Sequence, residues 1–242
     1  MKSLQLRSIK FVWGTFLIIL FSATALVAQK DYDEILDETT EVLGDLQKID
    51  ENEVPPSILK KAEAVVIVPK LKKGGFVVGG KHGKGVAMVR GEDGRWSDPI
   101  FVKITGGSIG FQIGYSSLDL FLVFKDAGTL RQLTKGKGTF TLGGDATVAA
   151  GPVGRQASAN TDLDFEAEIL SYSKSRGVFA GISIEGSDLR MANDLNKDCY
   201  GSNDRAEEIL KNGESGVKNT REIRNVKKEL AKMAGNRSST IN

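Results

Sequence analysis

The chain has 242 residues, of which 40% are hydrophobic and 26% are charged, so it can build one sizeable folded core. Its formal net charge is +2, but residues 1–28 hold three basic side chains and no acid, which leaves 30 basic and 31 acidic side chains in the remainder. This near-neutral body argues against a dedicated nucleic-acid binder, whose affinity depends on neutralising phosphates. The single cysteine, Cys199, excludes an intrachain disulfide.

The N-terminus has the order of a secretory signal peptide. A basic start precedes an apolar run from Phe11 to Phe21, and small residues follow up to Ala25 and Ala28. We therefore predict that residues 1–28 are a signal peptide cleaved after Ala25 or Ala28, and that the protein is exported and periplasmic or secreted, at the cell envelope. An uncleaved membrane anchor is the alternative, because the apolar run approaches the length of a spanning helix.

An amphipathic helix is expected at residues 31–50, where apolar residues recur at steps of three and four. Between Lys30 and Glu53 there are ten acidic and two basic side chains. An anionic bilayer would repel such a helix, so we expect it to pack against the body of the protein.

Strands are expected through the middle of the chain. Residues 64–68 form a β-branched run that ends at Pro69 and is typical of a strand buried on both faces. Residues 74–114 hold twelve of the 28 glycines between short segments of two-residue period, with a hairpin turn at 91–94. So many glycines in strands indicate bulges and sharp bends, and therefore a curved sheet.

The remaining segments extend this pattern towards the C-terminus. We predict a central strand at residues 118–124, a helix at 126–135 with Asp126 as its cap, and short strands at 140–153. An antiparallel pair is expected at 162–169 and 177–186, and a helical end at 191–235. The order predicts an α+β fold in which a strongly bent antiparallel sheet or small barrel is flanked by N- and C-terminal helices. Residues 29–242 would form one domain, with a core at about 54–201 and C-terminal helices at 203–235.

Two catalytic motifs are matched only in part. Ser108 lies in a G-x-S-x-G string, but that motif needs a helix after the serine, whereas a strand pattern follows, and the only histidine, His82, precedes it. Residues 79–85 are similar to a phosphate-binding loop but have glycine where Ser or Thr must follow the Gly-Lys pair. We therefore predict no enzymatic activity and no catalytic residue.

No metal or cofactor is expected. A single histidine and a single cysteine cannot build a zinc site. Asp162, Asp164, Glu166 and Glu168 could suggest calcium, but on one face of a strand they would stand about 6.6 Å apart, so a charged solvent face is the preferred interpretation. Cys199 is expected to be a buried apolar residue, because no histidine is near it in sequence.

Five lysines flank adjacent predicted strands and could attract an anion, namely Lys70, Lys72, Lys73, Lys81 and Lys84. Turn amides beside them could hold an anionic group. The alternative is a solvated hairpin that carries lysines because it faces water.

Several phrases of the sequence, taken in order, resemble the SYLF domain family. The phrases, which span about residues 36–233, are PSIL leading into AVVIVP, GGFVVGG with GKG, GRWSDP, GFQIG, GVFAGISIEGS and YG. The resemblance implies non-enzymatic binding of membrane lipids, of phosphoinositides in eukaryotic members, and actin bundling in some fungal members. The family's basic N-terminal helix is not matched, because residues 31–50 are acidic, so the remaining basic candidates are the five lysines and the helix at 217–234.

We therefore expect a non-catalytic domain that binds anionic phospholipid headgroups at a membrane surface through Lys70, Lys72, Lys73, Lys81 and Lys84, without a cofactor and without nucleic acid. The alternative is a protein–protein interaction module, as in the actin-binding relatives, that uses the same bent sheet.

Overall fold

The computed structural model describes residues 31–47, 56–76, 78–109, 114–135, 138–153, 167–175 and 178–233. The predicted signal peptide lies outside these ranges, as do residues 162–166 of one predicted strand. Within them, no helix combines the length and the apolar character needed to cross a bilayer.

Nine strands form one sheet, and helices precede and follow it. The strands are β1 Ala64–Phe76, β2 Val78–Val89, β3 Ile100–Ile109, β4 Gly114–Phe124, β5 Thr139–Leu142, β6 Val148–Ala150, β7 Ile169–Ser175, β8 Val178–Gly181 and β9 Ser187–Met191. The helices are one at residues 31–47, α2 Pro56–Lys61, α3 Ala127–Arg131 with the 3-10 turn η1 Gln132–Thr134, α5 Asn193–Tyr200, α6 Asn203–Asn212 and α7 Arg221–Met233.

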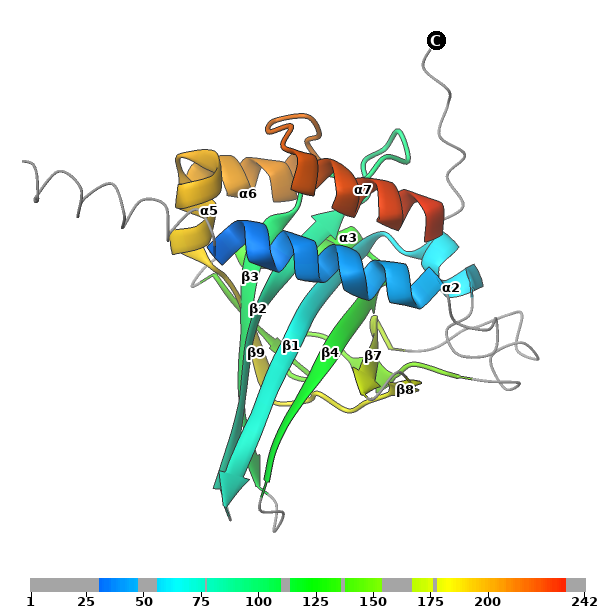
Figure 1. Cartoon of the computed structure of the whole chain (residues 1–242), viewed down its shortest axis with the longest axis vertical. Coiled ribbons are helices and arrows are strands. Elements are labelled where there is room, and N and C mark those ends of the chain that lie inside the picture. The colour runs from blue at the N-terminus through cyan, green and yellow to red at the C-terminus, as the bar shows by residue number, and fades with distance from the viewer. Residues whose placement is uncertain are drawn as a thin grey trace, which may run out of the picture.

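The sheet curls until its two ends come close together (Figure 1). Its order is β5-β9-β3-β2-β1-β4-β7-β6, with β8 paired to β7, and all neighbours are antiparallel except β6 and β7. An isolated bridge between Leu142, at the end of β5, and Ala146, just before β6, links the two ends. The predicted α+β fold with a strongly bent, barrel-like sheet is confirmed, with one parallel pairing added.

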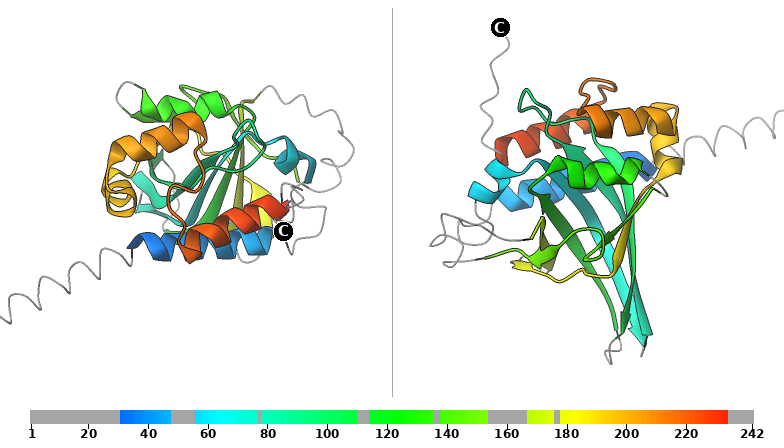
Figure 2. Two further views of the ribbon diagram at one scale, coloured as in Figure 1. Left: turned by 90° about the horizontal axis from the view of Figure 1, so that it is seen from above. Right: turned by 180° about the vertical axis from the view of Figure 1, so that it is seen from behind.

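The two faces of the curled sheet bury separate apolar clusters. On the outer face, residues such as Ile67, Met88 and Phe121 pack with the 31–47 helix, α5 and α7. On the inner face, residues such as Val68 and Leu122 pack with α3 and α6. Figure 2 shows these two sets of helices on opposite sides of the molecule. Covering helices on both faces explain why β1 and β4 are apolar throughout their upper halves.

The lower parts of β1 to β4 run beyond the layer of helices (Figure 1). We call residues 71–76, 78–84, 104–109 and 114–118 the projecting end of the sheet. Tyr115, 70% exposed, lies there. Most of the predicted five lysines are in this part of the sheet, so its two faces determine what the lysines can meet.

Several predicted boundaries are wrong although the elements exist. β1 does not end before Pro69 but continues through it to Phe76. β7 begins at Ile169, where the predicted acidic strand was expected to end, and pairs with β8 as an antiparallel hairpin. β9 was not predicted at all. The helix at 31–47 and the Asp126 cap, whose carboxylate accepts a hydrogen bond from Gly128 N, agree with prediction.

Candidate functional site

A β-bulge in β1 decides which face each lysine occupies. Pro69 and Lys70 stand together opposite the single residue Asp119 of β4, and the register of β1 shifts between Val68 and Leu71. Lys70 has φ +48°, in the left-handed region, and its N–H donates to Asp119 Oδ1 at 2.9 Å. Because side chains alternate along a strand, one extra residue exchanges the two faces for everything after it.

As a result the five lysines do not form one cluster. Val68 and Leu71 both belong to the inner apolar cluster, so Lys72 falls on the outer face and Lys73 on the inner face. On β2, a Cβ added to Gly83 would touch Val68 and Leu71, which places Gly83 on the inner face together with Lys81, two residues away. The outer group is therefore Lys70, Lys72 and Lys84, and the inner pair is Lys73 and Lys81.

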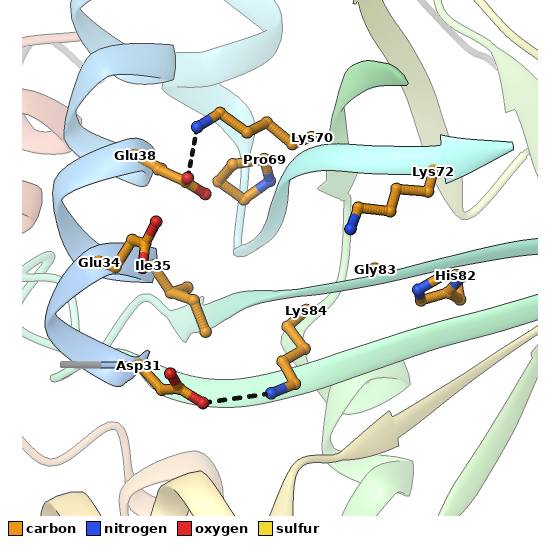
Figure 3. A pocket seen from close by; sticks show the side chains of 10 residues that line it. All are labelled: Asp31, Glu34, Ile35, Glu38, Pro69, Lys70, Lys72, His82, Gly83 and Lys84. Atoms are coloured by element: carbon orange, nitrogen blue, oxygen red, sulfur yellow. Dashed lines mark hydrogen bonds and ion pairs between the residues drawn. The ribbon is translucent and has the colours of Figure 1, made fainter. Parts of the chain in front are cut away.

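The outer group lies beside the acidic helix (Figure 3). It lines an open cavity of about 410 Å³ between the 31–47 helix and β1 and β2, together with His82 and the carboxylates of Asp31, Glu34 and Glu38. Lys70 Nζ donates to Glu38 Oε1 at 2.6 Å, and Lys84 Nζ lies 3.8 Å from Asp31 Oδ2. The hydrogen bond to Glu38 is the main reason that the pKa of Lys70 is raised.

The acidic composition of the helix now has a structural explanation. Its apolar residues, among them Leu36 and Leu43, are buried against the sheet, and Asp31 and Glu38 pair with lysines of the outer face. A third contact of this kind joins Lys174 of β7 to Asp45. The expectation that this helix packs against the body is confirmed, and it neutralises part of the positive charge that the sequence placed nearby.

The inner pair has no such counter-charge. Lys73 and Lys81 are directly opposite each other in the β1–β2 register, and Lys81 is only 8% exposed. Burial lowers the pKa of both lysines, and the charge of Lys73 lowers that of Lys81 further. No carboxylate among the described residues contributes to either lysine. Like charges in this position destabilise a sheet, so the pair is unusual.

Some of the lysines in and just before the basic C-terminal helix make contacts inside the protein instead of facing solvent. On α7, Ile223, Val226 and Leu230 are buried in the outer cluster. Lys227 Nζ is 2.5 Å from the buried Asp98 Oδ1, and Lys218, just before the helix, donates to the carbonyl oxygen of Cys199 at 2.6 Å. These contacts favour a closing helix over a membrane-surface element.

The GRWSDP segment connects distant parts of the chain through buried hydrogen bonds. Asp98 is fully buried and accepts hydrogen bonds from the backbone N–H groups of Gly216 and Lys218, so it fixes the loop that leads into α7. Arg90 stacks 4.7 Å above the Trp96 ring, and the Tyr200 hydroxyl donates to the carbonyl oxygen of Pro99. Sequence reasoning did not identify the Asp98–Lys227 pair; a lone aspartate gives no signal of its distant partner.

The partial catalytic motifs lie in the wrong structural context. Ser108 is inside β3 opposite Gly79, so no helix springs from it, and His82 is inside β2 opposite Thr105. Lys84 and Gly85 also belong to β2 rather than to a phosphate-binding loop. Cys199 is buried as expected, and burial raises the pKa of its thiol to about 11, which makes it a poor nucleophile. Among the described residues, no group of three or more potential ligands could hold a metal ion.

Comparison with known proteins identifies the family. Residues 105–233, more than half of the chain, match the family model Ysc84, which is described as "Las17-binding protein actin regulator". Over 158 residues the chain is 40% identical to SH3 domain-containing YSC84-like protein 1 of Xenopus laevis, covering 65% of this chain and 47% of that protein. It is 38% identical over 157 residues to the protein of that name from Homo sapiens, covering 65% and 45%.

A yeast relative has the same extent of similarity. LAS seventeen-binding protein 3 of Saccharomyces cerevisiae is 36% identical over 159 residues, which are 65% of this chain and 34% of that protein. The chain therefore spans about half, or less, of the length of these relatives.

The predicted export is contradicted by these relatives. They are SH3 domain-containing and LAS seventeen-binding proteins from vertebrates and yeast, and the family is described by actin regulation. These findings contradict the predicted periplasmic or secreted location. A short apolar run after a basic start was too weak a pattern to decide the location. The SYLF resemblance, in contrast, is confirmed: the chain belongs to the Ysc84 family.

Proposed function

We propose that the chain is a non-catalytic protein-interaction module that recognises its partner with the projecting end of the bent sheet. The observation that carries the proposal is that β1 to β4 run past the covering helices and leave Lys72 and Tyr115 exposed. Family and relatives are described by Las17 binding and actin regulation, so a polypeptide of the actin or Las17 kind is the first partner to test.

The arrangement suits binding better than chemistry. An exposed aromatic residue next to cationic side chains is typical of protein-binding surfaces, in which aromatic anchors supply much of the affinity. The two candidate nucleophiles that the sequence offered are unsuited to that role, since Ser108 lies within a strand and Cys199 is buried.

Co-sedimentation with actin filaments tests this function. The wild-type chain is expected to pellet with filaments, and the double variant Lys72→Glu, Tyr115→Ala is expected to remain largely in the supernatant. Lys197→Glu is the matched control, because Lys197 is exposed on α5, away from the projecting end. Wild-type protein that pellets with neither actin filaments nor immobilised Las17 would refute the proposal.

A second candidate function is binding of anionic phospholipid headgroups by Lys70, Lys72, Lys73, Lys81 and Lys84. The observation in its favour is the concentration of these lysines in two adjacent strands, with Lys72 exposed and the side chain of Lys84 56% exposed although Asp31 is near. Against it, the acidic 31–47 helix lies beside three of the five. Vesicle pelleting at low and high salt separates the candidates, because salt-sensitive pelleting with anionic vesicles supports lipid binding.

A further inference from the structure

The inner pair belongs to a row of residues that crosses β4, β1, β2, β3 and β9 and continues to Leu142 of β5. The registers align Ser116 of β4, Lys73 of β1, Lys81 of β2, Gly106 of β3 and Ser187 of β9 side by side. The row therefore presents two ammonium groups between small residues. No carboxylate of the described chain stands in it.

The side chain of Lys81 packs on the sheet instead of extending freely into solvent. The side chain of Lys81 lies over the bare backbone of Gly106, where an added Cβ would come within 2.7 Å of Lys81 Cε. Among the described residues, four have a buried side-chain nitrogen or oxygen atom without a hydrogen-bond partner, namely Arg90, Trp96, Tyr172 and Asn203. The amine of Lys81 is not among these buried atoms. Its stem is therefore covered while its amine still reaches solvent.

On the same inner face, the next row towards the tip of the sheet leaves room for a ligand. Gly75 of β1 is paired with Gly79 of β2 on one side and Gly114 of β4 on the other. These positions carry no side chain, so an extended chain can lie against this part of the sheet and bring a side chain up to the two amines.

We propose that the Lys73–Lys81 row is the receiving site for a carboxylate on an extended, acidic segment of a protein partner. The inference rests on the proposed protein-binding function and names the chemistry of the partner. Two opposed lysines without a counter-ion provide the charge complementarity, and a carboxylate between them would form two charge-assisted hydrogen bonds. The site lies on the inner face of a curled sheet, which an extended peptide can enter and a flat bilayer cannot.

The test uses a fluorescent nine-residue peptide of alternating Glu and Thr, and the same peptide with Gln in place of Glu. The wild-type chain is expected to bind the Glu peptide and not the Gln peptide. Lys73→Met and Lys81→Met each keep the apolar stem and should weaken binding by about tenfold, as expected for loss of one partner from a partly buried charge pair. Lys103→Met is the matched control, since Lys103 is exposed on the outer face of β3, and should change binding by less than about twofold.

Three outcomes would overturn the inference. They are equal binding of the two peptides, equal effects of Lys81→Met and Lys103→Met, and Lys81-dependent binding of anionic vesicles without binding of the Glu peptide. Thermal unfolding of each variant verifies that the fold is retained. Binding of the same variants to actin filaments and to immobilised Las17 separates the two proposals: wild-type protein that binds neither refutes the protein-binding function, whereas any of the three outcomes with wild-type binding intact refutes only the receiving site.

Discussion

The two faces of β1 and β2 carry lysines in opposite electrostatic situations. On the outer face, Lys70 and Lys84 have carboxylates of the 31–47 helix within 4 Å. On the inner face, Lys73 and Lys81 have each other, and no described carboxylate. The contrast teaches that a group of lysines close in sequence is not one binding surface, because the strand distributes them and the neighbouring element decides which charges remain available.

The largest expected effect comes from crowding the inner face at the bulge. A Cβ added to Gly85 would lie 2.0 Å from the carbonyl oxygen of Ile67 and 2.7 Å from Val68 Cα, both backbone atoms of β1. Gly85→Ala should therefore lower the free energy of unfolding by about 3 kcal/mol. Urea denaturation measures it.

Gly107 is the matched control for that substitution. It lies in the adjacent strand β3, and an added Cβ would meet nothing within 4 Å. Gly107→Ala should change the free energy of unfolding by less than about 0.5 kcal/mol. Similar losses for the two variants would show that the bulge does not bring β1 over Gly85.

Lys227, which is paired with the buried carboxylate of Asp98, gives the next contrast. Lys227→Met removes the ammonium 2.5 Å from the buried Asp98, which keeps its two backbone donors. We expect a loss of about 2 kcal/mol in the free energy of unfolding, because a buried carboxylate loses its counter-charge. Lys228→Met, on the exposed side of α7, should be nearly neutral. A neutral Lys227→Met would mean that the backbone donors alone hold Asp98.

The opposite sign is expected for the inner pair. Lys81→Met removes a like-charge contact and should raise the free energy of unfolding by about 0.5 kcal/mol, the size of a cross-strand charge effect. Loss of stability would instead mean that the ammonium has a stabilising partner.

The pH dependence of that gain follows from the direction of the pKa shifts. Burial lowers the pKa of Lys73 and Lys81 below 10.5, so in the interval up to 10.5 the unfolded chain binds more protons than the folded one. The contribution of these lysines to stability therefore rises with pH. The advantage of the double variant Lys73→Met, Lys81→Met over the wild type should be complete at neutral pH and vanish above 10.5. A gain independent of pH would point to packing instead of charge.

The smallest effect is expected on the outer face. Glu38→Gln removes the main cause of the raised pKa of Lys70, so that pKa should fall towards 10.5 in an NMR titration of the lysine amines. Because the Lys70 side chain is 64% exposed, the free energy of unfolding should change by less than about 0.5 kcal/mol. The stabilising contribution is present below pH 10.5 and is lost as the pH rises through the raised pKa. An unchanged pKa would show that the pair does not persist in solution.

Local patterns were sufficient for most of the fold. The three- and four-residue spacing of apolar residues identified the 31–47 helix, and the glycine-rich segments indicated a bent sheet. β9 was missed because its five residues alternate between apolar and polar for too short a stretch to be distinguished from a loop. Residues 162–166 of the predicted acidic strand lie outside the described residues, and β7 begins at Ile169, after the described Ala167 and Glu168.

The division of the lysines could not be predicted from the same patterns. Strict alternation from Val68 would have put Leu71 and Lys73 on the outer face and Lys72 on the inner face. Pro69 was the available signal, because proline within a strand is found at edges and bulges, but it was interpreted as the end of the strand. The partner of each lysine depends on long-range packing of the 31–47 helix, which spacing within β1 and β2 does not reveal.

The extra residue at Pro69–Lys70 has a consequence for comparing members of the family. Loss of Pro69 alone would shorten β1 by one position and swap Lys72 and Lys73 between the concave and convex sides, while the number of lysines and the net charge stay the same. Homologues with matching lysine counts can therefore differ in what they capture, and alignments should be read for gaps at this position before shared ligands are assumed.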